Sequence, residues 1–301
     1  MLPQNKKIAV QAPAKINLFL QVLGRRSDGY HNLETWMQKL DLFDTVTLEL
    51  SGGTGIDFSC DDPALSDGSD NLAVKGAIAF FSALNVAKQP KLRIHLEKRI
   101  PVAAGLGGGS SDAGAVIRGL NAMFEKPFSE SELIDLARPL GADVPFFVIE
   151  KNAVFAGGIG DIMYPVDSIE KYCFVLVNPN FFVSTKWVFD NLSLTSTNKK
   201  SKLSSFRKHK AKSLSLEIMH NDLEKVTSAR YSEIESMKRM LIDLGATRAM
   251  MSGSGPTVFG VFPDTEKPGD SGLKGVVGEL SKRFGDKVFV VRANAGAWPS
   301  G

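Results

Sequence analysis

The chain has 301 residues, of which 43% are hydrophobic and 23% charged, a balance typical of globular proteins that excludes a disordered or fibrous chain. Its 36 basic and 33 acidic residues leave a formal net charge of +3, which is too small to indicate a nucleic-acid coat. Two cysteines, Cys60 and Cys173, exclude a disulfide framework and a zinc site built from cysteines, and the length suggests about two domains.

Nothing in the sequence indicates a membrane or an export route. No apolar run reaches the roughly 18 residues that would suggest a transmembrane helix. Residues 1–7 lack the apolar core of a secretion signal. We therefore expect a soluble, cytoplasmic protein that has neither a membrane nor a nucleic acid as its partner.

Extended segments dominate the first fifty residues. Residues 7–11 and 14–22 are expected as strands joined at Pro13, which lacks a backbone donor and so marks a turn or an edge. A polar turn over residues 24–29 follows, and residues 45–50 then alternate as a strand does.

The middle of the chain mixes helical and extended periods. Apolar residues at helical spacing predict a helix over residues 71–84, and alternation predicts a half-buried strand over residues 92–96. A second helix is expected from Ser110 onward. Ser129 and Glu132 form a capping-box pair that predicts the start of a third helix.

The C-terminal part begins with a short, almost continuous apolar run. Residues 172–177 are expected as a buried strand, and we place a domain boundary just before it, giving domains of residues 1–168 and 169–301. Further expected elements are a helix over residues 234–245, a strand, a Gly-Ser turn, a strand over 257–262, a helix over 273–284 and a strand over 287–292. Helices and strands mix in both halves, which favours an α+β fold.

One segment, residues 195–213, carries seven basic residues and no acidic residue. A solvated loop is the simpler interpretation, and a patch for phosphates or RNA is the alternative. Phe206 is the only aromatic residue in the segment, which weakens a single-strand-binding role.

The strongest local signal is a glycine-rich loop between the predicted strand 92–96 and the following helix. It comprises Pro101, Val102, Ala103, Ala104, Gly105, Leu106, Gly107, Gly108, Gly109, Ser110 and Ser111. Glycines let a bulky oxyanion approach the backbone N–H groups, and the helix start adds free donors. The loop is neither a Walker A loop, which needs a Lys-Ser/Thr pair, nor a dinucleotide fingerprint. It predicts a polyphosphate site, with a turn that binds nothing as the alternative.

Two charged residues could act beside such a site. Asp143 lies between Gly141, which is expected to end a helix, and Pro145, which is expected to prevent that helix from continuing. It could be a turn residue or a general base. Lys15 shares a strand face with Asn17 and could be a solvent-facing edge residue or a cation beside a carboxylate or phosphate.

Two further motifs are weaker when taken alone. Residues 252–257 form a second glycine turn, which resembles many hairpins. Tyr30 and His31 place an aromatic face beside an imidazole, and they could equally be structural residues.

These pieces, in this order, resemble the GHMP kinase superfamily, whose motifs are an N-terminal lysine strand, a central glycine-serine loop and a C-terminal Gly-Ser-Gly-Pro turn. Residues 12–18, 26–31, 141–145 and 183–185 resemble in particular its kinases for a cytidine-diphosphate-linked methylerythritol in the non-mevalonate isoprenoid route. The resemblance covers nearly the whole chain. It implies two domains, an S5-like N-terminal domain and a ferredoxin-like C-terminal domain.

For the reaction, the resemblance implies that Asp143 takes a proton from the substrate hydroxyl. Lys15 would keep Asp143 ionised and stabilise charge on the transferred phosphoryl group. Residues 101–111 would hold the phosphates of ATP, bridged by Mg²⁺. Asn71 would lie near the adenine, and residues 252–256 would close the site from the second domain.

For the acceptor, the resemblance implies a substrate that carries a cytidine diphosphate. Tyr30 and Phe189 would stack on the cytosine, and His31 would read its polar edge. Asn17 and Thr185 would help to place the sugar-alcohol end, whose 2-hydroxyl would accept the phosphoryl group. No residue is assigned as a metal ligand.

Two alternatives remain open at this point. One is a GHMP kinase for homoserine or mevalonate, although neither substrate would need the nucleobase reader at Tyr30 and His31. The other is a non-catalytic nucleotide- or RNA-binding module, in which Lys15 and Asp143 need not occur together.

Overall fold

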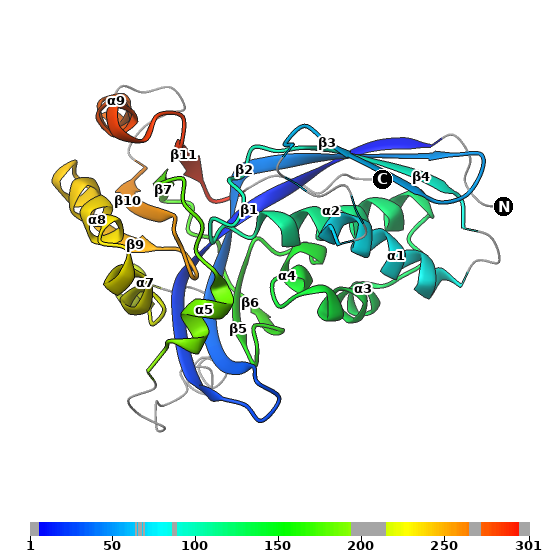
Figure 1. Ribbon diagram of the computed structural model, residues 1–301, viewed down its shortest axis with the longest axis horizontal. Coiled ribbons are helices and arrows are strands. Elements are labelled where there is room, and N and C mark those ends of the chain that lie inside the picture. The colour runs from blue at the N-terminus through cyan, green and yellow to red at the C-terminus, as the bar shows by residue number, and fades with distance from the viewer. Residues whose placement is uncertain are drawn as a thin grey trace.

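The computed structural model describes residues 6–63, 65, 68, 70–85, 89–193, 215–264 and 272–294. The basic segment 195–213 lies outside these residues. Helices and strands alternate along the chain and form two sheets with their own helices (Figure 1), which confirms the predicted α+β class.

Within the described residues, seven strands form the first sheet, in the order β3-β4-β2-β1-β8, with β5 paired to β2 and β6 paired to β5. The strands are β1 (Lys7–Arg25), β2 (His31–Ser51), β3 (Ile56–Cys60), β4 (Lys91–Glu97), β5 (Ala153–Gly157), β6 (Ile162–Pro165) and β8 (His220–Asn221). The long antiparallel pair of β1 and β2 extends through both parts of the molecule (Figure 1).

Strand β1 continues through Pro13, where the sequence predicts a turn or an edge. The pairing with β2 shifts register between Pro13 and Lys15, and a bulge of this kind accommodates a residue without a backbone donor. A second shift lies between Asn17 and Phe19. Lys15 and Asn17 are both buried on this strand, so the interpretation of Lys15 as a solvent-facing edge residue is wrong.

Helices cover one side of the first sheet (Figure 1). They are α1 (Leu72–Leu84), α2 (Gly108–Met123), α3 (Glu130–Ala137) and α4 (Val144–Val148), with a 3₁₀ turn at Arg138–Leu140. The capping box of Ser129 and Glu132 opens α3 as predicted. A Cβ atom on Gly114 of α2 would lie 2.6 Å from Cβ of Phe147, so glycine lets α2 and α4 pack in direct contact.

The second sheet contains four antiparallel strands within the described residues, in the order β11-β7-β10-β9. They are β7 (Tyr172–Val177), β9 (Arg248–Met251), β10 (Val258–Pro263) and β11 (Val288–Arg292). Its helices are α5 (Thr185–Asp190), α7 (Glu224–Arg230), α8 (Glu233–Asp243) and α9 (Gly272–Phe284), with a 3₁₀ turn at Leu216–Ile218. Across all described helices, none combines the length and apolar character needed to cross a bilayer.

A shared hydrophobic cluster joins the two sheets. Phe19 and Trp36 of the first sheet are buried with Phe174 and Phe259 of the second. Strand β8 adds to this connection, because it comes from the C-terminal half of the chain and pairs in parallel with β1. The proposed boundary at residues 168/169 falls between β6 and β7 and remains a prediction.

Candidate active site

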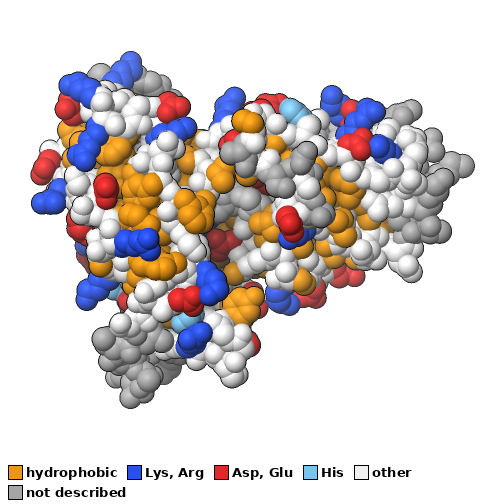
Figure 2. Space-filling view, in the orientation of Figure 1, with side chains coloured by type: hydrophobic (Ala, Val, Ile, Leu, Met, Phe, Trp, Pro, Cys, Tyr) orange, Lys and Arg blue, Asp and Glu red, His pale blue; other side chains and the backbone are white. Residues whose placement is uncertain are grey.

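A cavity of about 940 Å³ lies between elements of the two halves. Figure 2 shows a notch in the surface between the lobe of α8 and α9 and the lobe of α1 to α4. Fourteen of the predicted site residues line the cavity, namely Lys15, Asn17, Tyr30, His31, Ala103, Ala104, Gly105, Gly107, Gly108, Gly109, Ser110, Asp143, Thr185 and Phe189. The predicted residues outside its lining are Asn71, Pro101, Val102, Leu106 and Ser111.

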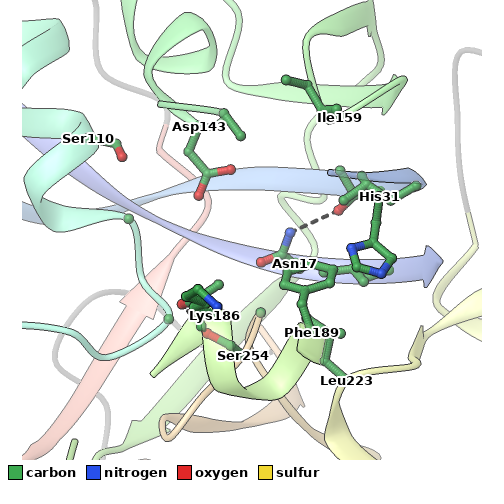
Figure 3. Close-up of a pocket in the computed structure, with 18 of the residues that line it drawn as sticks. Asn17, His31, Ser110, Asp143, Ile159, Lys186, Phe189, Leu223 and Ser254 are labelled. Carbon is green, nitrogen blue, oxygen red and sulfur yellow. Dashed lines mark hydrogen bonds between the residues drawn. The ribbon is translucent and has the colours of Figure 1, made fainter. Parts of the chain in front are cut away.

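The two charged candidates meet at this cavity. Nζ of Lys15 lies 3.3 Å from Oδ2 of Asp143, and their side chains are 5% and 34% exposed. The ammonium group also donates a 2.6 Å hydrogen bond to Oδ1 of Asn17. A buried cation thus lies beside a carboxylate that is partly exposed to the cavity. Figure 3 shows Asp143 among the residues that line the cavity.

Asp143 is the residue just before the short helix α4, and Pro145 lies in the first turn of that helix. The preceding helix does not continue through Pro145, and a new helix begins at Val144 instead. Proline is tolerated there because the first residues of a helix have no intrahelical partner for their N–H groups. The Asp143 side chain makes no capping hydrogen bond to α4 in the described structure. Its carboxylate is therefore available to the cavity.

Lys39, which no motif in the sequence indicated, contacts the other end of α4. Its Nζ donates a 2.9 Å hydrogen bond to the carbonyl of Ile149 and lies 4.8 Å from the ring centroid of Phe146. Burial, followed by repulsion from Arg118, lowers the pKa of Lys39 well below its usual value. The only feature of the sequence that could have indicated a buried role for Lys39 is its position among the apolar residues of β2.

The glycine loop needs glycine for two physical reasons. Gly105 and Gly107 have φ angles of +77° and +74°, in the left-handed region, and a Cβ on Gly105 would lie 2.2 Å from the carbonyl oxygen of Ser252. Gly107 is also the N-cap of α2 and has no side chain to bond the first-turn N–H groups. These donors, with the positive end of the helix dipole, suit an anionic phosphate.

The glycine turn of residues 252–257 is hydrogen-bonded to the glycine loop. Oγ of Ser252 donates a 2.9 Å hydrogen bond to the carbonyl of Gly105 and accepts a 3.3 Å bond from the backbone N–H of Asn17. Asn221, which the sequence analysis missed, donates from Nδ2 to the carbonyls of Met251 and Gly253. The loop, β1 and the C-terminal turn therefore form one connected wall.

Aromatic residues lie at another part of the cavity. The rings of His31 and Phe189 stack with their centroids 5.0 Å apart, and Figure 3 shows the two rings facing each other. Burial, followed by repulsion from Arg25, lowers the pKa of His31, which favours a neutral imidazole at neutral pH. Tyr30 is 61% exposed, and Oγ of Thr185 lies 2.8 Å from Oγ of Ser254.

Asn71 has a clear structural contact. Its side-chain oxygen accepts a 2.9 Å hydrogen bond from the N–H of Ala73 and so caps α1. The next residue, Leu72, lines the cavity. A place for Asn71 near the adenine remains a prediction.

A buried charge cluster beside the loop was also missed. Lys98, whose side chain is 7% exposed, forms ion pairs with Asp44 and Asp112, the latter at 2.8 Å. Asp44 also accepts backbone hydrogen bonds from Arg99 and Ile100, just before the loop. The signal was present in β2, where Asp44 occupies the same inward face as the buried residues Val46, Leu48 and Leu50.

Replacing Asp112 by Asn is expected to remove a pH dependence of stability. Burial raises the pKa of Asp112 to about 7, attraction by Lys98 opposes the rise, and repulsion from Asp44 adds to it. Between the ordinary value of 3.8 and about 7, the folded chain holds a proton that the unfolded chain has released. The stabilisation from this carboxyl is thus complete at low pH and is lost as the pH rises.

Urea unfolding of the wild type and the Asp112→Asn variant at about pH 4.5 and about pH 7.5 measures this effect. The free energy of unfolding of the wild type should fall relative to that of the variant as the pH rises. A constant difference between the two proteins would contradict the assignment.

Comparison with known proteins identifies the chain. Residues 71–151 match the GHMP kinases N terminal domain, and residues 203–270 match the GHMP kinases C terminal family. The 4-diphosphocytidyl-2-C-methyl-D-erythritol kinase of Desulfotalea psychrophila is 49% identical over 288 residues, 95% of each chain. That of Syntrophotalea carbinolica is 45% identical over 280 residues, 93% of this chain and 96% of the relative.

Solved structures agree with these matches. A crystal structure of 4-(cytidine 5'-diphospho)-2C-methyl-D-erythritol kinase gives a TM-score of 0.76 at 29% identity, covering 96% of this chain and 100% of that chain. Homoserine kinase from Cytophaga hutchinsonii gives a TM-score of 0.72 at 18% identity, covering 96% and 95% of the two chains, a likeness of fold alone. The predicted two-domain GHMP architecture is thereby confirmed. The chain belongs to the GHMP kinase family and, within it, to the 4-diphosphocytidyl-2-C-methyl-D-erythritol kinases.

Proposed function

We propose that this chain transfers the γ-phosphoryl group of ATP to the 2-hydroxyl of 4-diphosphocytidyl-2-C-methyl-D-erythritol. The observation that carries this proposal is the pair of Lys15 and Asp143, 3.3 Å apart, in the cavity that the glycine loop also lines. Relatives that bear this kinase name match along nearly the whole chain. The expected product is a precursor in the non-mevalonate isoprenoid route.

Asp143 is the proposed proton acceptor. Its carboxylate is partly open to the cavity, so a substrate hydroxyl can approach it and lose its proton as the bond to phosphorus forms. Lys15 supplies positive charge beside the transferred phosphoryl group. Asn17, which accepts a hydrogen bond from Lys15 and donates one to Thr35, fixes the direction of the ammonium group.

As a member of the GHMP kinase family, the chain uses ATP. The uncapped first turn of α2 and the positive φ angles at Gly105 and Gly107 fit a polyphosphate. Among the described residues, no three or more His, Cys, Asp or Glu side chains gather as a metal site. Mg²⁺ that accompanies ATP would neutralise charge on its phosphates during the transfer.

The aromatic part of the cavity is the proposed cytidine site. Tyr30 and Phe189 supply ring faces for the cytosine, and the neutral His31 supplies hydrogen-bonding nitrogens for its polar edge. Thr185 and Asn17 also line the cavity, and we propose that they orient the sugar alcohol. Because its second substrate is ATP, we propose the cytoplasm as the place of the reaction.

A transfer assay tests the proposal directly. The purified chain is incubated with γ-labelled ATP, Mg²⁺ and, separately, the cytidyl substrate, homoserine and mevalonate. We expect label to pass to the cytidyl substrate alone. Transfer to homoserine or mevalonate, with none to the cytidyl substrate, would overturn the proposed function.

Replacing His31 by Ala is expected to lower kcat/KM for the cytidyl substrate by about 10-fold or more, because a buried polar edge of the base loses its partner. The KM for ATP should remain near the wild-type value. Steady-state kinetics with each substrate varied in turn provides the measurement.

A matched control for this variant is His95→Ala. His95 lies on β4, outside the cavity lining, where its Nδ1 contacts Oγ of Ser59 at 2.9 Å. This variant should keep both KM values. Equal damage by His31→Ala to the use of both substrates would contradict a role in reading the base.

A further inference from the structure

Two adjacent phenylalanines in the connection between β7 and α5 have opposite environments. The ring of Phe181 stacks on that of Tyr231, with centroids 4.7 Å apart and planes at 21°. Phe182 instead is 68% exposed and lines the cavity. The backbone therefore turns one ring into the second domain and the next ring into the candidate site.

The exposure of Phe182 is unusual for its side chain. It is the most exposed large hydrophobic side chain among the described residues, and Tyr30, at 61%, is the next. Both side chains line the same cavity. A phenyl ring left in water forgoes the favourable free energy of burial, so an apolar ring at the wall of a cavity indicates a ligand surface.

The protein holds this connection in place from both sides. The guanidinium of Arg230 lies 5.4 Å from the ring centroid of Tyr231 and 4.6 Å from that of Trp187 on α5. The stack of Phe181, Tyr231, Arg230 and Trp187 thus joins the connection to the helix that follows it. Phe182 lies within this braced segment, and such preorganisation lowers the entropy lost when a ligand binds.

We propose that Phe182 is an aromatic contact for the nucleoside part of the cytidyl substrate, in addition to Tyr30 and Phe189. A phenyl ring has no polar group, so its partner on the substrate is a π-face or a C–H face. The cytosine and its ribose are the largest such surfaces on a molecule whose other parts are a diphosphate and a polyol. This inference rests on the proposed function.

The position of Phe182 favours the cytidyl substrate over ATP. It precedes α5, whose Phe189 lies with Leu223 on one side of the cavity, while Asp143 and Ile159 lie on the other (Figure 3). The glycine loop, proposed for ATP, belongs to the first domain. An effect on ATP alone would therefore point to a different arrangement.

The variant Phe182→Ala tests the assignment, with Phe182→Tyr as the conservative change. We expect the alanine variant to raise the KM for the cytidyl substrate about 5- to 10-fold, the low range for one lost stacking partner. The tyrosine variant should stay near wild type, and the KM for ATP should not change in either. Calorimetric titration with cytidine diphosphate, which requires no turnover, should show the same loss of affinity.

The matched control is Ile242→Ala, because Ile242 is 46% exposed on α8 and lies outside the cavity lining. Wild-type affinity of Phe182→Ala for both cytidyl ligands, or a change confined to ATP, would overturn the assignment while leaving the proposed function intact. Failure of the wild-type chain to phosphorylate the cytidyl substrate would overturn both.

Discussion

Replacing Asp143 by Asn is expected to lower kcat by at least ~10²-fold, because the amide cannot accept the proton that the substrate hydroxyl releases. The substitution keeps the size of the side chain and the cavity wall at α4. The dissociation constant of ATP should therefore remain near that of the wild type. Single-turnover transfer from labelled ATP, together with calorimetric titration of ATP, separates the two quantities.

Asp135→Asn is the matched control, since Asp135 is 70% exposed and pairs with Arg138 on the surface. It should retain full activity. If Asp143 and Lys15 act on the same transferred group, the variant that combines Asp143→Asn with Lys15→Met should be little worse than the poorer single variant. Unchanged turnover of Asp143→Asn would remove this residue from the mechanism.

Replacing Lys98 by Met is expected to cost about 3–5 kcal/mol of folding free energy, the usual penalty for removing one partner of a buried ion pair. Lys98 is the shared cation of Asp44 and Asp112, whose side chains are 0% and 4% exposed. Without it, two buried carboxyls face each other with no compensating charge. Urea unfolding near neutral pH, monitored by circular dichroism, measures this loss of folding free energy.

Two companion variants make this result interpretable. Lys91→Met removes a cation paired with Asp57, whose side chain is 54% exposed, and should cost less than about 1 kcal/mol. Adding Asp112→Asn to Lys98→Met removes one of the stranded carboxyls and should recover part of the lost stability. A loss for Lys98→Met as small as that for Lys91→Met would contradict the assigned role.

Elements with a strong local pattern were predictable from the sequence. The run of apolar residues over 172–177 is strand β7 with the predicted bounds, and the capping box at Ser129 opens α3. The glycine loop was likewise predictable, because its glycines are required by the local backbone conformation. In each case, the determining interactions lie within a few residues of one another.

Contacts between distant residues were not predictable from periodicity. Lys15 lies on β1 and Asp143 lies just before α4, far apart in the chain, and a contact between two such residues leaves no repeating pattern in the sequence. The sequence pattern around each residue did not decide whether Lys15 and Asp143 pair, and only the resemblance to the GHMP kinases suggested that they do. The opposite directions of Phe181 and Phe182 escaped notice for the same reason, since the stack on Tyr231 spans fifty residues of sequence.

The pairing of β8 with β1 has a consequence for how the chain is made. Phe19 and Leu20 find their parallel neighbours at His220 and Asn221, about 200 residues later in synthesis. During synthesis, the first sheet therefore lacks the strand that pairs with this edge of β1 until the last third of the chain has left the ribosome. A fragment that stopped earlier would contain Lys15 and Asp143 without the hydrogen bonds of the late-arriving Ser252. Phosphoryl transfer is accordingly a property of the finished polypeptide, and neither half produced alone would supply it.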